Sequence, residues 1–137
     1  MRPLVIDGSA ALAWAMVDES SGLADAALER LRAGGGMAPQ IWWTELRNGL
    51  LAAERRGRIS PGGTDAALAA LDDLPITLDR TPHGAMVLRI AREHNLTVYD
   101  AMYLELALRL DGPLATLDRE LARAAAEAGG TVFSADA

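Results

Sequence analysis

The sequence predicts a three-layer α/β/α domain with a short-stranded, mostly parallel central sheet. Short apolar runs alternate with longer helical patterns along the chain, and such alternation is typical of βαβ units, in which helices cover both faces of a parallel sheet. Half of the 137 residues are apolar but only 4% are aromatic, which favours helices over an all-β sandwich. At this length we expect one domain over residues 1–137, built around one core.

Turn and breaker residues separate the elements of the first half. Glycines 34–36 should end the second helix, and Gly57 with the Ser60-Pro61 pair should end the third. In chain order we expect a strand over residues 4–6, helices over 10–17 and 23–31, a very short strand over 37–39 and a helix over 41–56.

Turn and breaker residues also separate the elements of the second half, with turns at residues 95–96 and 111–113 and a glycine pair at 129–130. We expect a helix over residues 65–74, a strand over 75–78, helices over 83–94 and 99–110, a strand over 114–117, a helix over 118–128 and a strand over 131–133. In such sheets ligands bind beyond the carboxyl ends of the strands.

Composition excludes several mechanisms. The chain has no cysteine and therefore no disulfide, thiolate metal site or cysteine nucleophile. All 13 basic residues are arginine, which excludes a P-loop NTPase, a Schiff-base enzyme and a kinase of the usual kind. The net charge of −6 argues against electrostatic coating of nucleic acid but is compatible with a metal site made of carboxylates. The N-terminal apolar stretches are too short for a signal peptide or a membrane span, so the expected location is the cytoplasm.

Four acidic residues stand near the starts of helices. Asp7 and Asp118 directly follow predicted strands, Asp100 opens a strongly apolar helix, and Glu45 lies one turn into another. If these helix starts share the carboxyl edge of the sheet, the four carboxylates converge there.

Two interpretations of these acids compete. Taken singly, the three aspartates can cap helices or complement helix dipoles, each contributing ~1 kcal/mol. Glu45 is different, because it borders an apolar stripe and needs a cation or a hydrogen-bond partner there. Four carboxylates in one cleft repel one another unless a divalent cation neutralises them, and oxygen-only ligands select Mg²⁺ or Mn²⁺.

Four segments resemble, in order, the motifs of the PIN-domain family. Residues 4–9 (Leu-Val-Ile-Asp-Gly-Ser) resemble its opening, and residues 39–50 resemble its second motif, with Glu45 and then Asn48. Residues 99–107, which begin Tyr-Asp-Ala-Met-Tyr-Leu, look like the third motif, and residues 114–121 look like the fourth. At this length the chain is most similar to the VapC-type toxins of bacterial toxin–antitoxin modules. The main departure is Gly8, where alanine or threonine is more usual.

The resemblance implies a Mg²⁺- or Mn²⁺-dependent endoribonuclease that a cognate antitoxin protein holds inactive. By position, the acidic constellation is Asp7, Glu45, Asp100 and Asp118. Asp7 and Asp100 are assigned as direct or near-direct metal ligands, and Glu45 and Asp118 as completing a second site or holding metal-bound water. The hydroxyls of Ser9 and Thr116 are expected to hydrogen-bond these carboxylates. Which acid acts as the base stays open.

Several other features have both a structural and a functional interpretation. Arg55, Arg56 and Arg58 either guide RNA or offset a helix dipole. Trp14, Trp42 and Trp43 either stack nucleobases or fill core or partner-facing surface. The family resemblance adds the expectation that Trp14 with Met16, near Trp42 or Trp43, forms a groove for an antitoxin segment. The helix over 99–110 is apolar nearly all round, which indicates a central helix or a homodimer contact. The two histidines, His83 and His94, receive no role.

Two alternatives to a ribonuclease toxin stay open: a nuclease acting on single-stranded DNA, and a catalytically silent PIN-fold binding module. A phosphatase of the haloacid-dehalogenase type is excluded, because its second aspartate would stand where this chain has Ser9. A receiver domain is excluded because it needs a lysine at a strand end.

Overall fold

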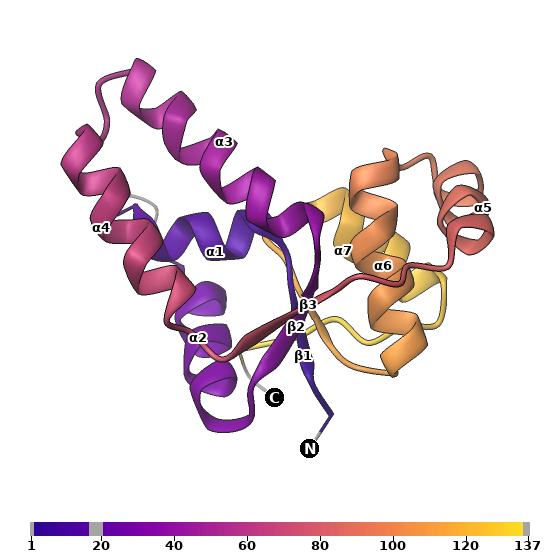
Figure 1. Cartoon of the computed structure of the whole chain (residues 1–137). Helices are drawn as coiled ribbons and strands as arrows, with labels where there is room; N and C mark the ends of the chain where they lie inside the picture. Colours follow the sequence, from indigo (N-terminus) through magenta and orange to yellow (C-terminus); the bar gives the residue numbers. More distant parts are fainter. Residues whose placement is uncertain (1, 17–20, 136–137) are drawn as a thin grey trace.

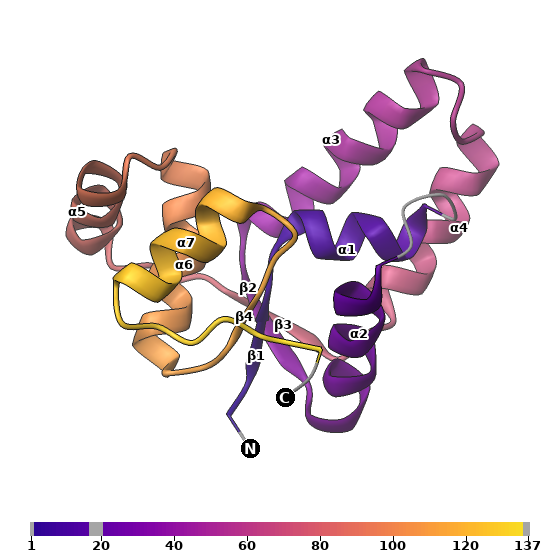
Figure 2. The same ribbon diagram turned by 180° about the vertical axis from the view of Figure 1, so that it is seen from behind.

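The computed structural model describes residues 2–16 and 21–135. Four parallel strands form one sheet in the order β3-β2-β1-β4, and helices lie on both of its faces (Figures 1 and 2). The predicted three-layer fold is therefore confirmed. The strands are β1 (Leu4–Ile6), β2 (Gly36–Pro39), β3 (Ile76–Asp79) and β4 (Leu114–Ala115). The helices are α1 (Gly8–Ala15), α2 (Gly22–Gly34), α3 (Ile41–Arg55), α4 (Pro61–Asp72), α5 (Gly84–His94), α6 (Val98–Leu110) and α7 (Arg119–Glu127).

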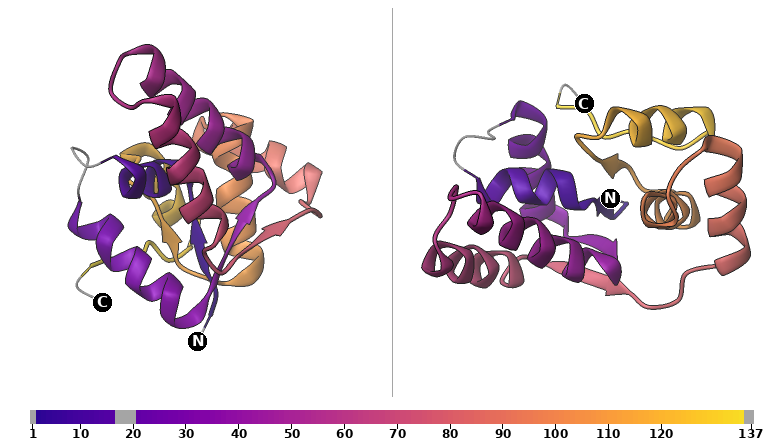
Figure 3. Two further views of the ribbon diagram at one scale, coloured as in Figure 1. Left: turned by 60° about the vertical axis from the view of Figure 1, so that its left-hand side comes forward. Right: turned by 90° about the horizontal axis from the view of Figure 1, so that it is seen from above.

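The helices divide into two groups. Helices α1 to α4 lie on one side of the sheet and α5 to α7 on the other, and the α3–α4 pair projects away from the sheet (Figures 1 and 3). Helix α2 contacts β1 and β4, whereas α6 contacts β1, β2 and β4 from the opposite face. Strand β1 pairs with β2 on one side and with β4 on the other, so the strand order changes direction beside β1. Ligands of such folds bind at this topological switch point, beyond the carboxyl ends of the strands.

Helix α6 is central to the molecule. Residues 103–107 of this helix are all buried, with Tyr103 and Leu104 among the largest fully enclosed side chains. Contacts with the sheet, α5 and α7 account for this burial within one chain. The all-round apolar character of the helix therefore needs no second subunit, and the homodimer stays a prediction.

The structure corrects several element boundaries; helix α2, for example, runs to Gly34 and not to residue 31. Helix α4 begins at Pro61 and not at residue 65, because the Ser60 hydroxyl accepts a hydrogen bond from the Gly63 amide (3.0 Å) and proline suits the first helical position. Strand β4 ends at Ala115, two residues early. The predicted strand over 131–133 is reduced to one bridge between Val132 and Leu114. The predicted end of the first helix, residue 17, lies outside the described residues.

The glycine-rich turn between α2 and β2 has two distinct requirements. Gly35 adopts a φ of +71°, a left-handed conformation that glycine adopts without strain. Gly36 pairs with Leu4 of β1, and a Cβ on it would stand 2.8 Å from the Leu4 carbonyl oxygen and 2.6 Å from a methyl group of Leu31. Helix α2 can thus pack against the start of the sheet only over a residue without a side chain.

Gly36→Ala should lower the free energy of unfolding by about 1–3 kcal/mol, the usual cost of overpacking a core. The matched control is Gly22→Ala, because no atom lies within 4 Å of the Cβ added there. Urea unfolding of both variants measures the difference. Equal midpoints for the two variants would contradict the close approach of α2 to β1.

Among the described residues, no helix combines the length and the apolar character needed to cross a membrane.

Candidate active site

Asp7 is the most enclosed of the candidate acids. It follows β1 directly, and its side chain is 4% exposed. The carboxylate accepts hydrogen bonds from the Ala10 amide (3.0 Å), from the Ser9 hydroxyl (2.8 and 2.9 Å to its two oxygens) and from the Thr116 hydroxyl. It therefore caps α1, as the simpler interpretation required, but it also has two hydroxyl partners that capping does not need.

Thr116 links Asp7 to Asp118. Its hydroxyl oxygen accepts a hydrogen bond from the Asp118 amide (3.0 Å), and the Ser9 hydroxyl accepts one from the Leu117 amide (3.0 Å). The Asp118 carboxylate then caps α7 by accepting from the amides of residues 120 and 121. The ends of the neighbouring strands β1 and β4 are thus joined through side chains at the carboxyl edge of the sheet.

Glu45 has the hydrogen-bond partner that its half-buried position requires. The phenol of Tyr103, on α6, donates to Glu45 Oε1 over 2.6 Å. Sequence analysis missed Tyr103 because an aromatic residue in an apolar helix is expected in the core. The available signal was its spacing, since Tyr103 lies three residues after Asp100 and therefore on the same face of α6. Gly8 adjoins this pair, and a Cβ on it would meet Glu45 at ordinary contact distance (3.5 Å).

Asp100 lies in the first turn of α6 and does not cap it. The cap is Thr97, whose hydroxyl accepts a hydrogen bond from the Asp100 amide (3.1 Å). The Asp100 side chain, which is partly buried, is therefore not needed to cap its own helix. Asp7 and Asp118 are themselves N-caps, whereas Asp100 complements the dipole of α6 from its first turn, beside the Thr97 cap.

The four acids form one electrostatic cluster. Burial is the largest cause that raises the pKa of the Asp7 carboxyl, to about 6, and the charge of Glu45 adds to it. Burial followed by the charge of Asp100 raises the pKa of Glu45, and burial followed by the charge of Asp118 raises that of Asp100. Burial and the hydrogen bond to Glu45 raise the pKa of Tyr103, which keeps it a phenol donor. Among the described residues, no arginine is one of the main causes of these three shifts, so the repulsion between the carboxylates is largely uncompensated.

The donor set fits Mg²⁺ or Mn²⁺. It consists of carboxylate and hydroxyl oxygens, which hard divalent cations prefer. Within residues 2–16 and 21–135, no three acidic or histidine side chains stand close enough together to hold an ion by themselves. Mg²⁺ tolerates this, since it keeps several water molecules and binds through one or two carboxylates. A hydrated cation would supply the missing positive charge.

The raised pKa of Asp7 predicts a pH dependence of the metal-free protein. Between the ordinary pKa of 3.8 and the folded value of about 6, the folded state binds more protons than the unfolded state. Raising the pH through this window therefore favours unfolding. The hydrogen bonds from Arg109 lower the pKa of Asp79, so this group stabilises the folded state as the pH rises. That contribution is complete once the pH exceeds about 5. In EDTA we expect a lower Tm at pH 7 than at pH 5.

Asp7→Asn is the control for this pH dependence, because it removes the titrating group but keeps the cap. Its Tm should change less between pH 5 and pH 7 than the wild-type Tm, and Mg²⁺ at pH 7 should raise the wild-type Tm. Identical pH profiles of the two proteins in EDTA would contradict the raised pKa of Asp7.

The remaining predicted features lie elsewhere. Arg55 ends α3 and Arg56 and Arg58 follow it, so all three are exposed at the end of the helix that is remote from Glu45. His83 caps α5, and its Nδ1 accepts a hydrogen bond from the Met86 amide (3.3 Å). The Nδ1 of His94 lies 3.4 Å from Oε2 of Glu127. Neither histidine belongs to the acidic cluster.

The expected groove between Trp14 and the other tryptophans is wrong. The indole N–H of Trp14 donates to the Ala24 carbonyl (2.7 Å), and this ring lines a pocket between α1, α2 and α4. Trp42 is buried in the core, and Trp43 lines a different pocket. Met16 packs against Leu50 and Ala53 instead.

The parallel sheet with an acidic carboxyl edge defines a class of α/β domain that comparison with known proteins identifies. The chain belongs to the PIN domain family, whose pattern it matches over residues 4–127. It is 40% identical over 90 residues to Ribonuclease VapC1 of two strains of Mycobacterium tuberculosis, CDC 1551 and H37Rv. That match covers 64% of this chain and 65% of each relative, slightly less than two thirds of their length.

The fold is also similar to that of a solved structure. The crystal structure of PAE2754 from Pyrobaculum aerophilum superposes with a TM-score of 0.68 at 27% sequence identity. The superposition covers 90% of this chain and 79% of the other. The architecture of most of the chain, and not of one motif alone, is therefore shared with a solved protein.

Proposed function

We propose that this chain is a single VapC-type nuclease domain over residues 1–137, the metal-dependent endoribonuclease toxin of a type II toxin–antitoxin system. The observation that carries the proposal is the acidic cluster: Asp7, Glu45, Asp100 and Asp118 come from four separate segments and influence one another electrostatically. The likeness to proteins named Ribonuclease VapC1 supports RNA as the substrate.

The cofactor is proposed to be Mg²⁺, with Mn²⁺ as a substitute. When bound, such a cation lowers the pKa of water and offsets the charge that develops on the phosphate. Asp7 and Asp100 are the proposed direct or near-direct ligands. Glu45 and Asp118 would complete a second site or hold metal-bound water molecules.

The surrounding side chains position these carboxylates. Ser9 and Thr116 donate to Asp7 and so hold the orientation of its two oxygens. Tyr103 occupies one oxygen of Glu45, which leaves the other oxygen to accept a hydrogen bond from water. Asp118 is held by the first amides of α7. The site is thus rigid before substrate arrives, which reduces the cost of ordering it in the transition state.

Two partners follow from this function. A cognate antitoxin protein would bind the toxin and block its acidic site, and a homodimer is the expected assembly of the toxin. Exposed apolar side chains of α5, Met86 at 38% and Leu88 at 45%, are available for a contact between two copies.

A substrate panel tests the proposal. Antitoxin-free protein is incubated with single-stranded RNA, double-stranded RNA and single-stranded DNA, each with Mg²⁺, with Mn²⁺ and with EDTA. We expect cleavage within the RNA strand that needs the cation. Cleavage of DNA alone would favour the DNA nuclease. No cleavage of any substrate by folded, cation-binding protein would favour a binding module and contradict the proposed activity.

A further inference from the structure

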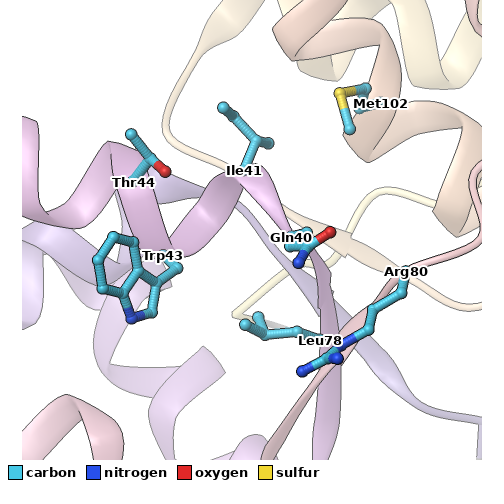
Figure 4. Close-up of a pocket in the computed structure, with 7 residues that line it drawn as sticks. All are labelled: Gln40, Ile41, Trp43, Thr44, Leu78, Arg80 and Met102. Carbon is cyan, nitrogen blue, oxygen red and sulfur yellow. The ribbon is translucent and has the colours of Figure 1, made fainter.

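A pocket of about 640 Å³ is lined in part by the first turn of α3, the helix that carries Glu45, and its volume is within the usual range for small-molecule sites. It lies between the start of α3, the end of β3 and α6, and its lining includes Gln40, Ile41, Trp43, Leu78, Arg80 and Met102 (Figure 4). Ile41 precedes Glu45 by one helical turn and so shares its face of α3. Met102 directly precedes Tyr103, the hydrogen-bond partner of Glu45. None of the four acids lines the pocket, so an RNA strand bound here would reach the proposed catalytic carboxylates by continuing past the first turns of α3 and α6.

Trp43 offers an aromatic surface that is already held in place. Its side chain is 50% exposed, the most exposed of the three tryptophans. The guanidinium of Arg47 lies 3.8 Å from the ring centroid, and Arg47 is itself held by the Trp43 carbonyl (3.1 Å) and by Asp72 (3.4 Å). Stacking a flat group on this indole would cost little side-chain entropy, because the ring is braced before the group arrives.

The opposite side of the pocket is positively charged. Arg80 follows β3 directly, and Figure 4 shows it across the pocket from Trp43, with Gln40 between them. Gln40 makes no side-chain cap to α3, so its amide is available to donate and accept hydrogen bonds. The pocket therefore combines an aromatic face, an amide and a cation, the three groups that recognise the base and the phosphate of a nucleotide.

We propose that this pocket binds one nucleobase of single-stranded RNA beside the phosphodiester bond that is cleaved, with the base stacked on Trp43 and Arg80 on a flanking phosphate. The proposal rests on the proposed function, which supplies the RNA. A single strand is specified because bases within a duplex are already stacked on their neighbours and cannot enter. Trp43 and Arg80 then contribute to substrate affinity and register, not to the chemical step.

Binding is measured by fluorescence anisotropy of a fluorescein-labelled 12-nucleotide RNA of mixed sequence. The parent protein carries Asp7→Asn, so that the RNA is not cleaved during the measurement. Base–aromatic stacking contributes about 1–3 kcal/mol, so adding Trp43→Ala should weaken binding roughly 5- to 150-fold. Trp43→Phe should keep most of the affinity. Arg80→Ala should weaken binding and lower the slope of log affinity against log salt by about 0.7, as expected for one lost phosphate contact on a single strand.

Two controls keep the test specific. Leu51→Ala removes an exposed apolar side chain (40%) two turns beyond Trp43 on the same helix and should leave RNA affinity unchanged. Indole fluorescence reports the contact directly: the short RNA should quench the emission of the parent, the Trp43→Phe variant should lose this quenching, and the same sequence as a duplex should not quench. Circular dichroism verifies that each variant is folded.

The outcomes separate the subsite from the nuclease. If Trp43→Ala binds RNA as the parent does and, with Asp7 intact, cleaves it with unchanged KM, the subsite is wrong but the nuclease stands. If the parent shows Trp43 quenching but no Asp7-containing protein cuts RNA, the nuclease is wrong but the subsite stands. Unchanged RNA affinity with loss of a co-purified antitoxin in Trp43→Ala would assign the pocket to a protein segment and overturn the proposal.

Discussion

Asp7→Asn should reduce RNA cleavage at least about 100-fold while leaving the protein folded. Even the outer partners of metal ligands affect activity by about 10- to 100-fold, and Asp7 is proposed as a ligand itself. Asparagine keeps an oxygen that can accept the Ala10 amide, so the cap of α1 survives. It also removes a buried negative charge, and the Tm at pH 7 in EDTA should be unchanged or higher.

The measurement is the single-turnover cleavage rate with saturating Mn²⁺, together with thermal melting. Asp65→Asn is the matched control, because Asp65 is exposed on α4 and outside the acidic cluster, and it should cleave at the wild-type rate. Loss of the fold in Asp7→Asn would favour capping as the main role of this residue, and a wild-type rate would contradict its role as a ligand.

Arg109→Ala should be among the most destabilising substitutions of a partly exposed side chain. The guanidinium binds Asp79 through two hydrogen bonds (3.1 and 2.8 Å) and Glu105 through two more (2.8 and 3.0 Å). The two carboxylates are 8% and 2% exposed. Glu105 also accepts from the His83 amide (3.2 Å), so this network joins β3, α5 and α6. Removing the cation leaves two buried charges unpaired, a loss of about 3 kcal/mol.

Arg123→Ala is the matched control for Arg109→Ala. Arg123 also binds two glutamates, Glu120 and Glu127, but all three side chains are exposed on α7. Exposed ion pairs contribute little, so this variant should unfold nearly as the wild type does. Urea unfolding at pH 7 compares them, and equal losses of stability in the two variants would contradict the assigned role of the buried network.

The positions of the four acids were predictable because strand ends and helix starts are local features of the sequence. The runs that end at Asp7 and before Asp118 are apolar, and parallel strands bring their carboxyl ends to one edge. The expected hydrogen bonds from the hydroxyls of Ser9 and Thr116 to the carboxylates are present in the structure, where both hydroxyls donate to Asp7. Roles as metal ligands remain predictions, since sequence and geometry alone do not measure metal binding.

Other features depend on tertiary packing and had no local signal. Tyr103 belongs to the site only because α6 lies against α3, so that its phenol reaches Glu45. The pairing of Arg109 with Asp79 joins residues 30 positions apart. Trp14 was assigned to the wrong groove, because periodicity does not say that its indole turns towards α2. The Ser60-Pro61 pair ends one helix in the sequence pattern but also begins the next, since proline fits both roles.

The central claim is that these carboxylates form one divalent-cation site that cleaves RNA. The most direct test is the single-turnover cleavage rate as a function of Mn²⁺ concentration, in the wild type and in Asp100→Asn. Asp100 is not the N-cap of α6, so the substitution changes the proposed ligand and leaves the Thr97 cap in place. We predict that Asp100→Asn needs at least about ten times more Mn²⁺ for half-maximal rate. The same Mn²⁺ dependence in both proteins would contradict the claim.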